Sequence, residues 1–285
     1  MDSNIEKWLT NRCKNNELYA EDKEKLMEMY KNIPKYKFSD IFNKDPNFYK
    51  INNIPCIRTK CIDNRTSLCS KSCILISRGI IKHENNIYKV LILEKDYIFK
   101  DVYCIQFLTE IYFHKLAFNN NNNNNVIIPE IQDYGELIDM EDNKTIYFYK
   151  IPYYEKKLNT DIDIICRLEN NNIVIDNNAE YRVLLDSYKK YMEGYNVLSY
   201  LREKYNINHN DIRFNFEKDN LKDYMENYSK TRNASIKESI LKLQKSNMYI
   251  SNNKCIIIDF EFACRLHDIL NGRNIHKTML ELDTE

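Results

Sequence analysis

An acidic residue directly follows one of the most apolar stretches of this chain. Residues 256–258 are three isoleucines in a row, a pattern typical of a buried β-strand, and Asp259 and Phe260 come next. A carboxylate at the end of a buried strand costs free energy unless a cation or hydrogen bonds meet it. Asp259 is therefore a candidate metal ligand.

A basic residue lies inside another apolar stretch. Residues 73–81 and 87–93 are apolar runs joined by the polar turn 82–86, so they predict a β-hairpin. Lys89 lies in the returning strand of that hairpin. Its ammonium group is costly there unless it meets phosphate oxygens or a carboxylate.

Glu110 is the candidate partner of Lys89. It lies in the middle of a helix predicted over residues 102–118, at a separation along the chain that suits strand, loop and helix. In the alternative, Lys89 extends from an edge strand to solvent. Lys95, at the end of the same strand, is the reserve candidate for the phosphate contact.

A polar loop follows the strongest predicted helix. Residues 181–205 carry apolar side chains at intervals of three and four, which predicts one continuous apolar stripe, and His209 and Asp211 come after it. Asp211 could accept a hydroxyl proton or orient a nucleophile, while His209 braces the loop. The alternative is a plain polar turn, which an asparagine-rich chain forms often.

Taken in order, these residues resemble the motifs of the protein-kinase-like superfamily, most closely the divergent kinases of large DNA viruses. The resemblance implies an α+β fold with two lobes, a small β-rich N-lobe and a truncated helical C-lobe. It also implies that Lys89, paired with Glu110, contacts the ATP phosphates, that Asp211 and His209 form the catalytic loop, and that Asp259 holds Mg²⁺.

A second metal ligand is left open by the resemblance. The family pattern places an asparagine where this chain has Phe216, one residue after Asn215. Asn247 fits by another criterion, because it begins the hairpin that leads into the candidate metal aspartate. Residues from about 216 to 246 are then an insertion in the C-lobe. A third alignment places residues 240–242 at the catalytic loop, which removes the base.

Several departures from the family favour an alternative. The turn expected to cover the phosphates, residues 63–71, contains no glycine, so side chains crowd the approach to its backbone. Only a short tail follows Asp259, where kinases carry more helices. Glu261 in place of a glycine is instead closer to small-molecule and atypical kinases, and it alters the flexibility of the loop because glycine tolerates φ > 0. The alternative is a catalytically dead pseudokinase that acts as a binding or scaffold module.

Three parts follow from this organisation: a helical extension over residues 1–50, an N-lobe over residues 51–155 and a C-lobe over residues 156–285. The extension either packs on the main domain, which is the more common outcome, or binds a partner. Within the N-lobe, the asparagine run at residues 119–125 has no apolar surface to bury and predicts a flexible surface loop.

Composition restricts the partners and the location. The 285 residues include 42 basic and 42 acidic side chains, a balance that argues against a nucleic-acid protein driven by bulk charge. No apolar run approaches the roughly 20 residues that span a bilayer, and the polar N-terminus lacks a signal-peptide core. We therefore expect a cytoplasmic protein, in the host cytoplasm if viral, with reduced thiols.

Four cysteines lie near one another in the sequence and could bind zinc through four thiolates: Cys56, Cys61, Cys69 and Cys73. Their pair spacings are looser than those of common zinc motifs, so they are alternatively small apolar residues on two strands. A non-kinase α+β interaction protein, with or without this zinc site, is the third hypothesis.

The first hypothesis is an ATP- and Mg²⁺-dependent phosphotransferase of the Ser/Thr protein kinase type. Its predicted cofactors are ATP and Mg²⁺. Its predicted partner is a protein substrate that offers a hydroxyl group, or a protein that binds the chain.

Overall fold

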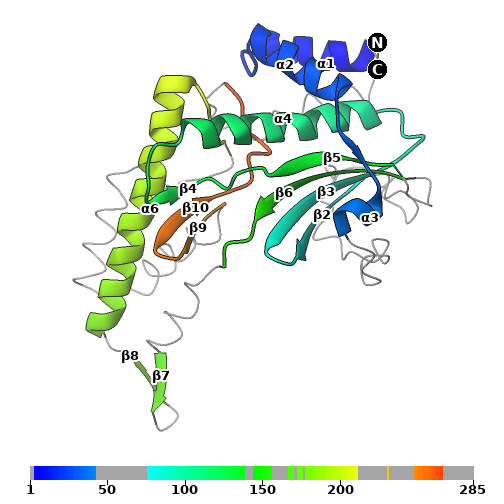
Figure 1. Ribbon diagram of the computed structural model, residues 1–285. Helices are drawn as coiled ribbons and strands as arrows, with labels where there is room; N and C mark the ends of the chain where they lie inside the picture. Colours follow the sequence, from blue (N-terminus) through cyan, green and yellow to red (C-terminus); the bar gives the residue numbers. More distant parts are fainter. Residues whose placement is uncertain are drawn as a thin grey trace, which may run out of the picture. The chain divides into compact units, whose positions relative to one another are not determined.

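The computed structural model describes residues 3–42, 76–138, 144–155, 166–169, 172–175, 177–210, 230 and 247–265. Within these ranges the chain forms five helices, a five-stranded mixed sheet, a three-stranded sheet and a two-stranded hairpin (Figure 1). The predicted α+β class is therefore confirmed.

The chain divides into two compact units. Among the described residues, the first unit contains those up to Lys115 together with Glu130–Tyr153. The second contains Leu116–Pro129 and the described part of Tyr154–Ile269. The N-terminal extension thus belongs to the first unit.

A five-stranded sheet is the centre of the first unit. Its strands, in spatial order, are β1 (Lys35–Tyr36), β5 (Asp133–Leu137), β6 (Lys144–Pro152), β3 (Asn86–Glu94) and β2 (Ile76–His83). All neighbours are antiparallel except β1 and β5, which are parallel. Strands β2 and β3 form the hairpin that the two apolar runs predict.

The two faces of this sheet carry different side chains because successive residues of a strand point to opposite sides. Tyr88, Val90 and Ile92 of β3 form a buried cluster on one face together with Ile146 and Phe148 of β6. The residues between them along each strand therefore point to the other face, where α4 lies.

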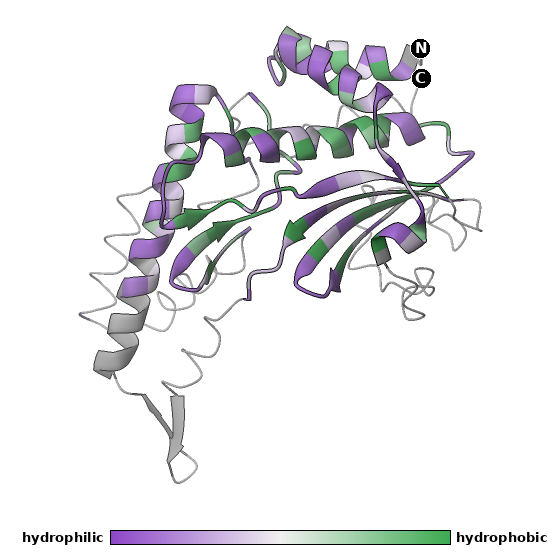
Figure 2. Ribbon diagram, viewed as in Figure 1, coloured by the Kyte–Doolittle hydropathy of each residue, from purple (hydrophilic) through white to green (hydrophobic). Residues whose placement is uncertain are grey.

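The helix predicted over residues 102–118 is α4 (Lys100–Asn120). Every residue from 102 to 114 is buried. A helix that is buried around its whole circumference must be covered on all sides, and Figure 2 shows hydrophobic positions along its length with hydrophilic ones between them. The sheet lies on one side of α4, and N-terminal residues lie on the other (Figure 1).

These N-terminal residues, 3–42, form what we call the N-terminal strap. Its elements are α1 (Ser3–Lys14), α2 (Ala20–Lys31), β1 and α3 (Phe38–Phe42). Helices α1 and α2 lie along α4, β1 extends the sheet at its edge, and α3 places Phe38 in the buried cluster on the opposite face (Figure 1). The extension therefore packs within the first unit.

The second unit combines a long helix with a small sheet. The helix predicted over residues 181–205 is α6 (Asn177–Tyr205). The sheet consists of β4 (Val126–Ile127), β10 (Lys254–Ile257) and β9 (Met248–Ser251), with β10 in the middle. A separate hairpin pairs β7 (Cys166–Glu169) with β8 (Asn172–Ile175). Figure 1 shows α6 beside β4, β9 and β10.

A close approach joins α6 to β10. A Cβ atom added at Gly194 would lie 2.6 Å from Sγ of Cys255. Any side chain at this position would therefore push the helix from the strand.

Side chains of the asparagine run at residues 119–125 form hydrogen bonds with the backbone of the same segment. Asn119 and Asn120 still belong to α4. After the helix, Nδ2 of Asn121 donates to the carbonyl oxygen of Val126 at 2.8 Å, and the backbone N–H of Asn125 donates to Oδ1 of Asn123 at 2.8 Å. The run thus ends α4 and leads into β4, and its residues 121–125 form a turn at the surface.

No helix among the described residues combines the length and apolar composition that a bilayer crossing requires.

Candidate functional site

Lys89 and Glu110 form an ion pair in the first unit. Nζ of Lys89 lies 2.8 Å from Oε1 of Glu110. The Glu110 side chain is 1% exposed and the Lys89 side chain 11%, so both charges are largely removed from water. The alternative in which Lys89 extends into solvent does not occur. A pair in this setting requires good geometry and further hydrogen bonds to offset its desolvation.

Tyr149 supplies such a hydrogen bond. Its hydroxyl donates to the same Oε1 atom of Glu110 at 2.6 Å. Strand pairing explains why it reaches this carboxylate, because Tyr149 of β6 lies directly opposite Lys89 of β3. Side chains opposite each other on neighbouring strands point to the same face of a sheet. Both donors therefore meet Glu110 from the sheet side.

The ring of Tyr149 is held by two side chains of α4. The ring of Phe107 lies with its centroid 5.5 Å away, and that of His114 lies 6.2 Å away in an edge-on arrangement. These residues are three before and four after Glu110, so all three lie on one face of the helix. We call Lys89, Glu110 and Tyr149 the lysine–glutamate centre.

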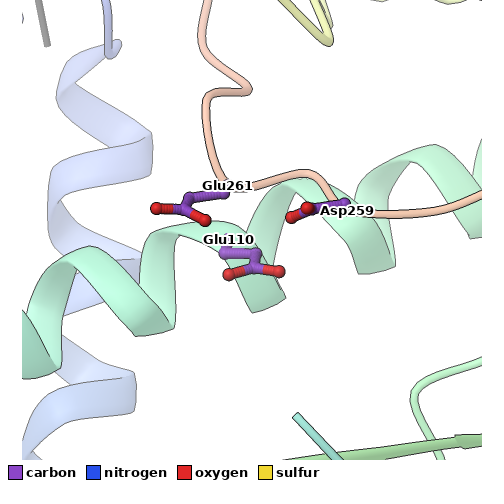
Figure 3. Close-up of side chains that lie close together, drawn as sticks. All are labelled: Glu110, Asp259 and Glu261. Atoms are coloured by element: carbon purple, nitrogen blue, oxygen red, sulfur yellow. The ribbon is translucent and has the colours of Figure 1, made fainter. Parts of the chain in front are cut away.

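A second group of polar residues follows β10 in the second unit. Asp259 has φ of +63°, a left-handed conformation that aspartate tolerates better than most residues. A carboxylate oxygen of Asp259 and one of Glu261 lie within 4.8 Å of each other. Figure 3 shows both side chains on the loop after β10, and it also shows Glu110 on α4 of the first unit.

His209 supports this loop from the segment after α6. Its Nε2 atom donates to the carbonyl oxygen of Ile258 at 2.8 Å, since a carbonyl can only accept. Its ring also lies against that of Phe260, with centroids 4.6 Å apart. His209 thus contacts both neighbours of Asp259, Ile258 and Phe260.

Two reciprocal backbone hydrogen bonds join the segment after α6 to the loop after β10. The N–H of Asn208 donates to the carbonyl oxygen of Cys264 at 2.9 Å, and the N–H of Cys264 donates back at 3.0 Å. We call residues 208–210 and 258–264 together the aspartate loop.

Asn247 directly precedes β9, and its backbone bonds to the aspartate loop. The β9–β10 ladder continues one step beyond the two strands, because the N–H of Ile258 donates to the carbonyl oxygen of Asn247 at 2.9 Å. Asn247 is therefore opposite the residue that precedes Asp259. Asn215, the other candidate for the second metal ligand, lies outside the described residues, so the choice between the two asparagines stays a prediction.

Several predicted residues lie outside the described ranges. They are Asp211, Asn215 and the four clustered cysteines Cys56, Cys61, Cys69 and Cys73. Their roles stay predictions. The described cysteines with free thiols are Cys13, Cys104, Cys255 and Cys264.

Sequence reasoning missed Tyr149 and treated Glu261 only as a departure from a motif. The signal for Tyr149 was its place in an apolar run, which does not reveal the strand register that sets it opposite Lys89. The signal for Glu261 was its spacing of two from Asp259, which allows both carboxylates on one short loop.

In comparisons with known proteins, no family model matches the chain, and no curated protein matches it.

Proposed function

We propose that this protein is an ATP- and Mg²⁺-dependent phosphotransferase of the protein-kinase-like type, acting on a protein Ser or Thr hydroxyl. The observation that carries the proposal is the ion pair of Lys89 and Glu110. A lysine on a sheet strand, paired with a glutamate on the following helix, is the arrangement that kinases use to contact nucleotide phosphates.

The hydrogen bonds around Glu110 suit this role. Phosphate binding requires that the lysine ammonium be fixed in direction before the nucleotide arrives. Glu110 fixes it, and Tyr149 fixes Glu110 through a 2.6 Å hydrogen bond. Lys89 would then neutralise developing negative charge on the phosphates.

The aspartate loop offers the ligands that Mg²⁺ prefers. Asp259 and Glu261 would contribute carboxylate oxygens, and Asn247, whose backbone pairs with Ile258, would contribute its amide oxygen. Hard oxygen donors of this kind fit Mg²⁺. An ion held there would supply positive charge that offsets the charge of the phosphates. Asp211 would orient the substrate hydroxyl as base.

Phosphate transfer from labelled ATP tests the proposal directly. The purified chain, with Mg²⁺ and a generic protein substrate, is expected to transfer label. Asp211→Asn and Lys89→Met are each expected to lower the rate by at least about 100-fold. The matched control is Lys82→Met, since Lys82 is exposed on β2 and its Nζ lies 3.6 Å from the Tyr153 ring centroid.

Transfer that is equal in Asp211→Asn and in the unchanged chain would end the phosphotransferase proposal. So would the absence of any transfer.

A pseudokinase is the second candidate, favoured by the lack of glycine in residues 63–71. Glycine-poor phosphate loops hinder close approach of backbone N–H groups to phosphate. This candidate predicts that ATP raises the melting temperature while no label is transferred. If ATP neither binds nor reacts, both candidates fall and the hypothesis of an α+β interaction protein remains.

A further inference from the structure

We propose that the N-terminal strap is an internal clamp that fixes α4 against the sheet, and that the contact of Asp22 with Tyr112 positions the Lys89–Glu110 pair. This inference rests on the proposed function for its consequence, because the pair matters through the phosphates it would contact. The contacts that support it all lie within the first unit.

Glu110 and Tyr112 point to opposite sides of α4. Residues of an α-helix are about 100° apart around its axis, so two positions of separation give about 200°. Glu110 meets Lys89 and Tyr149 on the sheet side. Tyr112 meets Asp22 of α2 on the other side. One helix is thus held on both faces within a single turn.

The Asp22–Tyr112 contact is a buried hydrogen bond. The Tyr112 hydroxyl donates to Oδ1 of Asp22 at 2.6 Å, and Asp22 is 1% exposed. The other carboxylate oxygen, Oδ2, accepts the backbone N–H of Tyr19 at 2.8 Å at the start of α2. A buried carboxylate is tolerated only when such bonds satisfy it. Asp22 therefore fixes α2 and α4 to each other.

Internal bonds make the helical hairpin of α1 and α2 a stiff body. Arg12 and Glu17 form an ion pair at 2.8 Å, with both side chains buried. The Arg12 guanidinium also lies over the Trp8 ring, 4.9 Å from its centroid. Lys23 of α2 binds Glu6 and Thr10 of α1. Movement of Asp22 is therefore coupled to the whole hairpin.

The far end of the strap is anchored to the sheet. The N–H of Glu136 donates to the carbonyl oxygen of Pro34 at 2.8 Å, and the Tyr36 hydroxyl donates to Asp133 at 2.7 Å. This hydrogen bond to Asp133 is the main reason that the pKa of Tyr36 rises to about 12. Phe38 then enters the buried cluster on the opposite face. The strap is thus attached on both sides of the sheet.

This arrangement has a consequence for control of the pair. Kinases switch activity by moving the helix that carries the glutamate. Here the outer face of that helix is covered by the same chain, and every residue from 102 to 114 is buried. The Lys89–Glu110 pair is therefore expected to form in the isolated chain, without a partner on α4.

Reactivity of the Lys89 amine tests the clamp without any assumption about function. The full chain is treated with an acylating reagent, and labelling of Lys89 is followed by peptide mass spectrometry. Tyr112→Phe removes the hydroxyl that binds Asp22, so the pair should open more often and Lys89 should label at least about threefold faster. Tyr36→Phe is the matched control, because it removes one strap hydrogen bond that does not involve α4.

The clamp is overturned if Lys89 labels at the same rate in Tyr112→Phe and Tyr36→Phe. If Tyr112→Phe does not fold, Asp22→Asn weakens the same hydrogen bond from the other side. Faster labelling of Lys89 is expected there too, and labelling as slow as in the unchanged chain overturns the clamp.

ATP binding, measured on the same variants, separates the two proposals. The clamp predicts that Tyr112→Phe raises the Kd for ATP at least about threefold, while Tyr36→Phe leaves it unchanged. If the unchanged chain binds no ATP but the difference in labelling is present, the proposed function fails and the clamp stands. If ATP binds and labelling does not differ, the clamp alone fails.

Discussion

One oxygen atom, Oε1 of Glu110, accepts hydrogen bonds from both Lys89 and Tyr149. Two donors on one buried acceptor stabilise the carboxylate and define its direction. Lys89 alone could satisfy the charge, but it could not fix the direction as firmly. Tyr149 is therefore the residue that turns a buried ion pair into a centre of fixed geometry.

Removal of the Tyr149 hydroxyl should weaken the first unit. Tyr149→Phe keeps the ring against Phe107 and His114 and loses only the bond to Glu110. The free energy of unfolding is expected to fall by about 1.5 kcal/mol, as for a buried hydrogen bond to a charged group. Urea unfolding of this variant measures the change.

The matched control for this change is Tyr153→Phe. The Tyr153 side chain is partly exposed, and its ring can still contact Lys82 after the hydroxyl is removed. An equal loss of stability in both variants would contradict a special role for Tyr149.

Tyr200 has an unusual acidity that a pH titration can detect. Hydrogen bonds from Tyr205, Lys204 and Asn122 lower its pKa from 10 to about 8. Since the folded pKa is depressed, the tyrosinate form favours folding. This contribution is fully present above pH 10 and is lost as pH falls through 8. The ultraviolet absorbance of tyrosinate should therefore show an early step near pH 8.

Tyr200→Phe should remove that step, and Tyr195→Phe, another tyrosine of α6, should keep it. A step that persists in Tyr200→Phe would assign the low pKa to another tyrosine.

Among elements, β1 depends on a glycine in the neighbouring strand. A Cβ atom added at Gly135 of β5 would lie 2.5 Å from the carbonyl oxygen of Pro34 and 2.6 Å from the Tyr36 ring. Contacts this short force β1 away from the sheet. The parallel pairing of β1 with β5, and with it the far anchor of the strap, therefore requires glycine at this position.

Gly135→Ala tests this requirement. It is expected to lower the free energy of unfolding by about 2 kcal/mol, the range for overpacking at a close contact. Hydrogen exchange of the Glu136 and Ile138 amides, which bond to the strap, should speed up. The control is Ala117→Gly on α4, which removes a Cβ without a clash. Unchanged exchange at both amides in Gly135→Ala would contradict the close approach.

Asparagine takes the structural place of glycine in several turns of this chain. The sequence has only 4 glycines. Within the described ranges, positive φ angles occur at five asparagines, Asn16, Asn206, Asn210, Asn252 and Asn253, besides Glu84 and Asp259. Asn252 and Asn253 form the β9–β10 turn, where both central residues need φ > 0. Part of the high asparagine content of the chain thus supports turns that need positive φ angles.

At the level of the whole molecule, the proposed function requires residues from both units to serve one nucleotide. Lys89, Glu110 and Tyr149 belong to the first unit, and Asp259 and Asn247 belong to the second. A ligand that needs both groups stabilises both units, since binding to the folded state alone favours that state.

Hydrogen exchange with and without ATP and Mg²⁺ checks this requirement. Amides of β3 in the first unit and of residues 258–264 in the second should both exchange several-fold more slowly with the ligands present. Addition of EDTA should remove the protection of residues 258–264. Protection of one unit alone would show that the two groups do not act on the same nucleotide.

The sequence by itself determined the elements with a strong local pattern. The β2–β3 hairpin, α4, α6 and the β9–β10 hairpin all follow from the spacing of apolar residues. It also indicated that Lys89 needs a partner, because an ammonium group in an apolar strand is costly wherever the strand lies. Asp259, just after β10, was a candidate site for a similar reason, because a carboxylate at the end of a buried strand also needs a partner.

Only the tertiary structure decided what meets these groups. The position of Tyr149 opposite Lys89 depends on strand register, and the cover of α4 by the strap depends on contacts between residues such as Asp22 and Tyr112, which lie far apart in the chain. Local periodicity predicts the helix α4, but it does not show which residues of the chain cover it. Long-range pairing is fixed by the sum of many contacts, and no single stretch of sequence carries that sum.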